Sequence, residues 1–254
     1  MARSVREVDA QLANALDRLT EAHWWIHEMD RHYHYALPFR YYLNSFLRAL
    51  KEVPQILMME MQNTLGFKKW YKEATREVYE DELLTYLFKQ RDLVVHRSML
   101  LPQSKALYGI TEGCGLKAGI GGEVDPQLDS VDVMFRYIVV AAERGDWFGL
   151  LRDDEESLPC VERQWRLDRF PDIEVADLVA DAWRKVGTLV AATVEWLGGP
   201  DLNLELSCRH ADSTTRFLTF DRERLRTAME DLRNGVSRDE VYRQVARAAH
   251  FLRW

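Results

Sequence analysis

An arginine and a histidine lie close together in the segment RDLVVH, which runs from Arg91 to His96. Histidine acts as a base or an acid near neutral pH, and the arginine guanidinium presents a rigid fork of donors to phosphate oxygens. Metal-free cleavage of RNA requires a base for the 2′-hydroxyl, an acid for the leaving 5′-oxygen and a cation beside the phosphorane. The pair predicts a metal-independent endoribonuclease, with His96 in proton transfer and Arg91 binding phosphate.

Two charged neighbours complete this predicted catalytic site. Asp92 lies four residues before His96, on the same face of a helix, so its carboxylate is expected to orient the imidazole and fix its tautomer. A carboxylate also repels phosphate, and Arg97 is expected to offset that charge in substrate binding. The side chains of Arg91 and His96 leave a helix about 140° apart. They converge only because arginine is long and the helix ends nearby.

A second group of residues predicts different chemistry. The segment EAHWWIHEMDRHYHY holds four of the seven histidines. His23 and His27 are four residues apart, the spacing at which two imidazoles on one helix face share a metal. The candidates to complete the site lie in the same segment and are Glu28, Asp30, His32 and His34. The structural alternative is a polar turn after an amphipathic helix, with the imidazoles packed beside tryptophans.

The first hundred residues contain the helices that would position both sites. Apolar residues recur at helical spacing, and the connections are short, which favours antiparallel neighbours in a bundle. Pro54 is expected to kink or split the second helix, and Gly66 to end it. The predicted helices are 4–29, 37–63, 67–80 and 81–98.

Composition changes at Pro102, where a glycine-rich stretch to Val124 predicts turns or short hairpin strands. The remainder is predicted to be α+β. Ser237 followed by Glu240 predicts a capping box. The expected strands are 130–140, 160–167, 202–208 and 214–220, and the expected helices are 173–197, 221–233 and 237–252. The fold class is therefore mainly α: a helical bundle in 1–101, followed by an α+β region in 102–254 packed on it.

The segment FKKWYKEATREVYEDELLTYLFKQRDLVVHRSML, from Phe67 to Leu100, resembles the last two helices of the HEPN family. That family carries an arginine, a polar residue and a nearby histidine at the end of its last bundle helix, which here are Arg91, Asp92 and His96. The family more often has asparagine where Asp92 stands. The resemblance implies a toxin or defence ribonuclease that acts as a homodimer, because two such motifs meet across the HEPN dimer.

The net charge and the cysteine content limit which partners and which cellular compartment are expected. The net charge of −7 argues against a general nucleic-acid binder. No apolar run is long enough to span a bilayer, no signal-peptide pattern begins the chain, and no membrane partner is expected. The three cysteines are widely spaced, which favours reduced thiols in the cytoplasm. They are Cys114, Cys160 and Cys208.

Three functions remain open from the residues. The first is the ribonuclease, which requires no cofactor. The second is a non-catalytic bundle that binds RNA, a nucleotide or a protein partner such as an antitoxin. The third is a metal-binding helical protein that uses the histidines of residues 23–34. The arginines of the last two helices alternate with acidic residues and are expected to form a solvated face.

Overall fold

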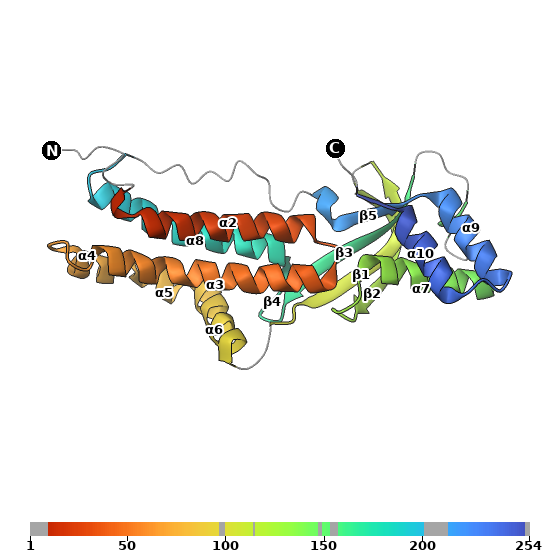
Figure 1. Ribbon diagram of the computed structural model, residues 1–254, viewed down its shortest axis with the longest axis horizontal. Coiled ribbons are helices and arrows are strands. Elements are labelled where there is room, and N and C mark those ends of the chain that lie inside the picture. The colour runs from red at the N-terminus through yellow and green to blue at the C-terminus, as the bar shows by residue number, and fades with distance from the viewer. Residues whose placement is uncertain are drawn as a thin grey trace. The chain divides into compact units, whose positions relative to one another are not determined.

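The computed structural model describes residues 10–96, 100–113, 115–146, 149–152, 157–200 and 213–251. The chain divides into two compact units, each built from separate stretches of sequence (Figure 1). The helical unit lies within residues 1–31, 40–101 and 175–210. The mixed unit lies within residues 32–39, 102–174 and 211–254.

The helical unit is built from long helices joined by short turns. Its helices are α2 (Ala13–Arg31), α3 (Ala36–Met61), α4 (Phe67–Ala74), α5 (Arg76–Glu80), α6 (Glu82–His96) and α8 (Val175–Trp196). α2 packs against α8, and the Trp183 indole donates a hydrogen bond of 2.8 Å to the Leu19 carbonyl. At the start of α2, the Glu60 carboxylate accepts from the backbone amides of Asn14 and Ala15, which satisfies free N–H groups at that helix end.

The predicted helices of the N-terminal part are confirmed over the described residues, with three differences. The first predicted helix, 4–29, is observed as α2 from Ala13, and residues 4–9 lie outside the described residues. α3 continues through Pro54 and is not split there. The Pro54 carbonyl accepts a 2.6 Å hydrogen bond from the buried hydroxyl of Tyr71, which ties α4 to α3. The expected single helix 67–80 is interrupted at Thr75. Gly66 is the N-cap of α4, where its φ of 83° favours glycine.

The mixed unit contains one antiparallel sheet with helices beside it. The strands are β1 (Gln103–Glu112), β2 (Gly115–Val124), β3 (Pro159–Leu167), β4 (Phe170–Glu174), β5 (Phe217–Phe220) and β6 (Ala249–Phe251). Their order is β2-β1-β3-β5-β6, and β4 pairs with β3 beyond that path. The helices are α7 (Ser130–Arg144), α9 (Arg222–Arg233) and α10 (Arg238–Ala248), and a 3₁₀ turn spans Ser213–Arg216.

The core of the mixed unit lies between one face of this sheet and its three helices. Ala106, Val161 and Leu218 from the strands are buried with Met134 and Ile138 from α7 and with apolar residues of α9 and α10. The register places Ala106 beside Arg163 and Tyr108 beside Val161, so alternate residues of β1 and β3 face these helices. The predicted glycine-rich hairpin is confirmed as β1 and β2.

The strand predicted at residues 130–140 is wrong, because the segment forms the first part of α7. Its valines and its isoleucine favour a strand by residue type. However, the buried positions recur at helical spacing, as with Met134, Tyr137, Ile138 and Ala141. Asp129 and Asp132 form a reciprocal capping box that fixes the start of the helix. The helix buries an apolar stripe that a strand would divide between two faces.

The observed C-terminal elements differ in part from the predicted ones. Ser237 caps α10 by accepting a hydrogen bond from the Glu240 amide, which is one half of the predicted capping box. The helix ends at Ala248 rather than at residue 252, and β6 follows it. The predicted strand 202–208 and the acidic run 153–156 lie outside the described residues. The fold is mainly α with an α+β C-terminal part, as expected, and no described helix is long and apolar enough to cross a membrane.

Candidate functional site

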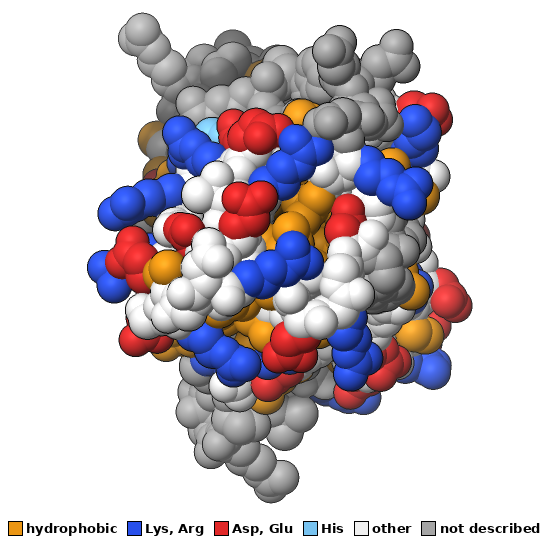
Figure 2. Space-filling model, turned by 90° about the vertical axis from the view of Figure 1, so that its right-hand side faces the viewer, with side chains coloured by type: hydrophobic (Ala, Val, Ile, Leu, Met, Phe, Trp, Pro, Cys, Tyr) orange, Lys and Arg blue, Asp and Glu red, His pale blue; other side chains and the backbone are white. Residues whose placement is uncertain are grey.

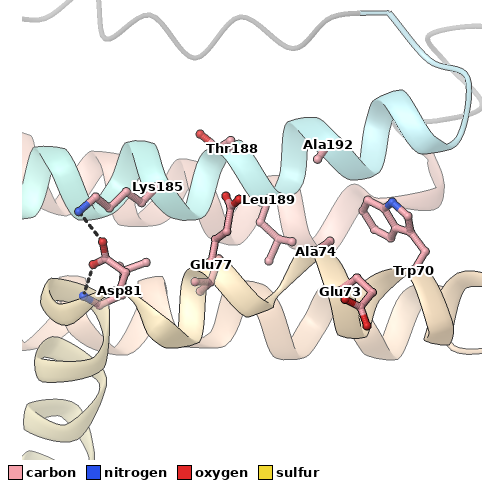
Figure 3. Close-up of a pocket in the computed structure, with 11 residues that line it drawn as sticks. Trp70, Glu73, Ala74, Glu77, Asp81, Lys185, Thr188, Leu189 and Ala192 are labelled. Carbon is pink, nitrogen blue, oxygen red and sulfur yellow. Dashed lines mark hydrogen bonds and ion pairs between the residues drawn. The ribbon is translucent and has the colours of Figure 1, made fainter.

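A groove on the helical unit lies between α8 and the run of α4, α5 and α6 (Figure 3). Its volume is about 500 Å³, within the range of sites that bind small ligands or peptide side chains. The floor is apolar, because Val78, Leu84 and Leu189 are almost completely buried beneath it. Ala74 and Ala192 add small side chains to the lining of the groove.

One wall of the groove carries carboxylates on successive helical turns. Glu73, Glu77 and Asp81 are four residues apart along α4, α5 and the turn before α6. Figure 3 shows the Glu77 side chain extending from α5 toward α8, beside Leu189. Within the described chain, Glu77 has no ion-pair partner, whereas Glu73 pairs with Arg76 across 2.7 Å between two well-exposed side chains. Such exposed pairs are weak, so the middle of this wall presents negative charge to a ligand.

An ion pair closes one end of the groove. Lys185 of α8 contacts the Asp81 carboxylate at 2.7 Å and Asp181 at 3.0 Å. The other Asp81 oxygen accepts from the Leu84 amide and caps α6. Partial burial alone would raise the pKa of Asp81, but the hydrogen bonds from Lys185 and Leu84 outweigh it and lower that pKa. Asp81 and Lys185 therefore form a fixed boundary, whereas Glu77 faces the open groove.

Aromatic rings form the opposite end of the groove. Trp70 stacks on Trp196 with ring centroids 5.6 Å apart, and both rings lie near Phe67. The face of an indole attracts cations. An apolar floor, a carboxylate wall and an indole end suit a ligand that is both cationic and apolar, such as the basic face of an amphipathic peptide. No histidine or cysteine stands among the described residues that line the groove.

The predicted catalytic arginine belongs to a cluster of ion pairs elsewhere on the helical unit. Arg91 lies 3.9 Å from Glu52 and 3.4 Å from Asp92. Glu52 of α3 also contacts Arg18 of α2 at 3.4 Å and Arg48 at 3.2 Å. One carboxylate thus brings together arginines from three helices. This arrangement gives Arg91 a structural contact between α6 and α3.

The predicted orienting residue, Asp92, also makes other contacts. Its carboxylate forms an ion pair with Lys51 of α3, and the hydrogen bond from Lys51 lowers the pKa of Asp92. His96 is the final residue of α6. Its side chain and the whole of Arg97 lie outside the described residues. The structure therefore locates Arg91 and Asp92. How either side chain lies relative to the His96 imidazole stays a prediction.

The histidines of the proposed metal site are divided between the two units. The rings of His23 and His27 are 4.7 Å apart on α2, and His23 also lies 5.0 Å from Trp183. His34 belongs to the mixed unit, where its ring contacts Ser130 and the Thr215 carbonyl. Throughout the described ranges, no group of three or more His, Cys, Asp or Glu side chains is arranged to hold a metal ion.

The arginines of α9 make structural contacts with backbone carbonyls. Arg222 donates to Ser157, Arg226 to Leu151 and Arg233 to Ala142. On the face of the mixed unit shown in Figure 2, basic and acidic side chains are interspersed around an apolar hollow. This view shows no basic patch of the kind that binds nucleic acid.

Sequence reasoning missed the acidic groove. The four-residue spacing of Glu73, Glu77 and Asp81 is visible in the sequence, and so is Trp70 one turn earlier. However, the other wall comes from α8, about a hundred residues away, with Lys185 and Leu189. Nothing in the local pattern indicates that α8 returns to this helical unit. The groove is visible only in the tertiary structure, where α8 lies opposite the row of carboxylates.

The fold and groove define a mainly α protein with a helical unit and a separate α+β unit. The chain belongs to the family described as Bacteriophage lambda protein ea47, whose model matches residues 6–229. The match covers most of both units. No curated protein and no solved structure matches the chain significantly.

This family assignment corrects the resemblance to HEPN proteins. The match to the ea47 family includes the whole segment, 67–100, on which the resemblance was based. An arginine and a histidine at short spacing form a weak motif, because a chain with many arginines contains such pairs by chance. In the structure, Arg91 also has a structural explanation, since it bridges α6 to Glu52.

Proposed function

We propose that the protein is a non-catalytic binding module whose helical unit holds a basic, amphipathic segment of a protein partner. The observation that carries this proposal is the Glu77 carboxylate, which faces an apolar groove without a cationic partner in the described part of the chain. Cationic side chains of the partner would lie along Glu73 and Glu77. Its apolar side chains would cover the part-exposed Trp70, Ala74 and Ala192. The net charge of −7 favours a basic partner by long-range attraction.

Charge reversal within the groove tests this function. The probe is a fluorescent amphipathic peptide of leucine and lysine, and a peptide with glutamate in place of lysine serves as its control. Glu77→Lys should weaken binding of the lysine peptide by at least about tenfold, equivalent to about 1.4 kcal/mol. Glu80→Lys makes the same charge change on an exposed residue of α5 outside the groove. It should change the dissociation constant less than about twofold.

Fluorescence anisotropy at increasing salt supplies the readout. Because the attraction is electrostatic, affinity should fall as ionic strength rises. The proposal fails if the wild-type protein does not bind the lysine peptide, or if Glu77→Lys and Glu80→Lys weaken binding equally. Binding of the glutamate peptide with the same affinity would also contradict it, since the carboxylate wall would then have no role.

Cleavage of RNA by Arg91 and His96 stays a prediction. Its two supports were the spacing of the pair and the HEPN resemblance, and the family assignment removes the second. The binding module predicts no turnover of RNA by either the wild type or His96→Ala. Cleavage of RNA by the wild type, together with its loss in His96→Ala, would favour the ribonuclease.

We also infer that the module acts in the cytoplasm. Cys160 is a buried free thiol whose pKa is raised to about 12 by burial and by the nearby Glu162 carboxylate. A thiol with such a pKa stays protonated and unreactive. A free, unreactive cysteine is the usual state in a reducing compartment. Thiol labelling of the protein in intact cells tests whether Cys114 and Cys208 are reduced there.

A further inference from the structure

The strand β2 lies at the outer edge of the sheet in the mixed unit. It pairs with β1 on one side, and the described strands place none on its other side. The edge is ten residues long, and its middle residues, from Lys117 to Gly121, are exposed. An open edge presents unpaired backbone N–H and C=O groups to another strand.

Soluble proteins usually protect such an edge, and on β2 this protection lies toward the ends of the strand rather than at its middle. Proline, charged side chains such as lysine, β-bulges and very short strands are the common devices. β2 contains no proline and only two charged residues, Lys117 and Glu123. Ile120, midway between them, exposes 39% of its surface. A bulge near Lys117 is the one irregularity in its pairing with β1.

The sequence of β2 is self-complementary about Ile120. In LKAGIGGEV, residues 116–124, positions at equal distance from Ile120 match in antiparallel pairing. Lys117 lies opposite Glu123 of a second copy, and Leu116 lies opposite Val124 of the second copy. Both charged pairs form at once, because a two-fold axis through Ile120 repeats each contact.

We propose that two copies of the chain join through β2, antiparallel and with the two Ile120 residues facing each other across a two-fold axis. The two sheets then form one continuous sheet. The two isoleucines make a β-branched cross-strand pair, which is a favourable contact. Backbone hydrogen bonds along the strand supply the affinity, and the two charged pairs fix the register.

Charges elsewhere on the hairpin support the same register. Glu123 already stands opposite Lys105 of β1. In the joined sheet it would lie between Lys105 of its own chain and Lys117 of the second copy, so that charges of opposite sign alternate across the strands. Parallel pairing in register would instead place Lys117 beside Lys117 and Glu123 beside Glu123, which is unfavourable.

Two charge-reversal variants of the full chain test the proposal. Lys117→Glu places glutamates opposite each other at both ends of the strand, and Glu123→Lys places lysines opposite each other. Each variant alone should be a monomer of 29.8 kDa by light scattering, whereas the wild type should be a dimer at about 100 µM, the regime of weak, small interfaces. An equal mixture of the two variants should form a heterodimer, because every reversed charge then meets its opposite.

The control variant is Glu112→Lys, which reverses an exposed charge of the same hairpin outside the proposed pairs. It should remain a dimer. Circular dichroism verifies that all variants keep the wild-type fold. A monomeric wild type, single variants that still dimerise, or a mixture that stays monomeric would each overturn the proposal. A wild-type monomer that instead binds an extended peptide along β2 would identify the edge as a peptide site.

Discussion

His34 is a histidine that the fold keeps neutral. Its Nε2 lies 2.9 Å from the Thr215 carbonyl, which only accepts hydrogen bonds, so this nitrogen carries the proton. Nδ1 therefore accepts from the Ser130 hydroxyl at 2.8 Å. Burial, and secondly the positive charge of Arg163, lower the pKa of His34 to about 3. A second proton would lie on Nδ1, which could then no longer accept from the Ser130 hydroxyl, whereas the hydrogen bond from Nε2 to Thr215 would persist.

The pH dependence of stability follows from that pKa. In the unfolded chain the imidazole titrates near about 6.5, whereas the folded protein binds its proton only near pH 3. Between these values the unfolded state binds the extra proton, so stability falls as pH falls below about 6.5. The contribution of His34 approaches at most about 1.4 kcal/mol per pH unit. Urea unfolding at several pH values between neutrality and about pH 5 measures it.

His34→Gln should remove this component of the pH dependence, even if it lowers stability at every pH. His250→Gln is the matched control, because His250 is an exposed histidine of the same unit. A wild-type and a His34→Gln protein with parallel stability curves over this range would show that His34 is not held neutral.

Single residues also show why the candidate site could not be predicted from the sequence. Arg91 and Asp92 have the side chains that phosphate chemistry requires, and their helix was predicted within two residues of its observed ends. Their partners on α3 are distant in sequence: Lys51 lies 41 residues before Asp92, and Glu52 lies 39 residues before Arg91. Whether an arginine binds a ligand or a neighbouring carboxylate depends on that packing. The sequence indicates the residue type without indicating the partner.

At the scale of elements, the β1–β2 hairpin depends on two glycines at which its strands approach closely. A Cβ atom added to Gly121 would lie 2.1 Å from the Ala106 carbonyl oxygen, and one on Gly109 would lie 2.1 Å from the Ala118 oxygen. Backbone atoms at such distances cannot move aside without disturbing the ladder. At Gly122 a Cβ would meet no atom within 4 Å.

Alanine substitutions at neighbouring glycines test this difference. Gly121→Ala should lower the free energy of unfolding by about 1–3 kcal/mol, the usual effect of overpacking. Gly122→Ala should stay within about 0.5 kcal/mol of the wild type, or stabilise slightly through the unfolded chain. Urea denaturation of both variants supplies the comparison. Equal effects at the two positions would contradict the close approach of β1 and β2.

Local patterns predicted most elements but not every element type. The helix at 175–196 and the strand at 159–167 follow from periodicity and from bounding turns. The segment at 130–140 was assigned to a strand because valine and isoleucine are common in strands. The segment forms the helix α7 because the Asp129–Asp132 capping box fixes its start and because its apolar stripe packs on the sheet. Residue type is a weaker guide than the face that an element buries.

At the scale of the whole molecule, the helical unit is completed by a helix that is distant in sequence. α8 contributes a long buried face to this unit, including Val179, Trp183, Val186 and Val190. The chain leaves the helical unit after Leu101 and returns to it at Val175. Such a return leaves no mark in composition, because α8 resembles any amphipathic helix.

A fragment of residues 1–101 should therefore fail to fold stably. Each buried aliphatic side chain of α8 contributes about 1.5–3 kcal/mol, and a whole domain is stable by only about 5–15 kcal/mol. Loss of α8 also exposes the α2 surface around Leu19, which Trp183 covers. Thermal melts followed by circular dichroism should show no cooperative transition for this fragment. Adding residues 175–200 through a flexible linker should restore one, whereas a cooperative melt of 1–101 alone would mean that the first four predicted helices are sufficient.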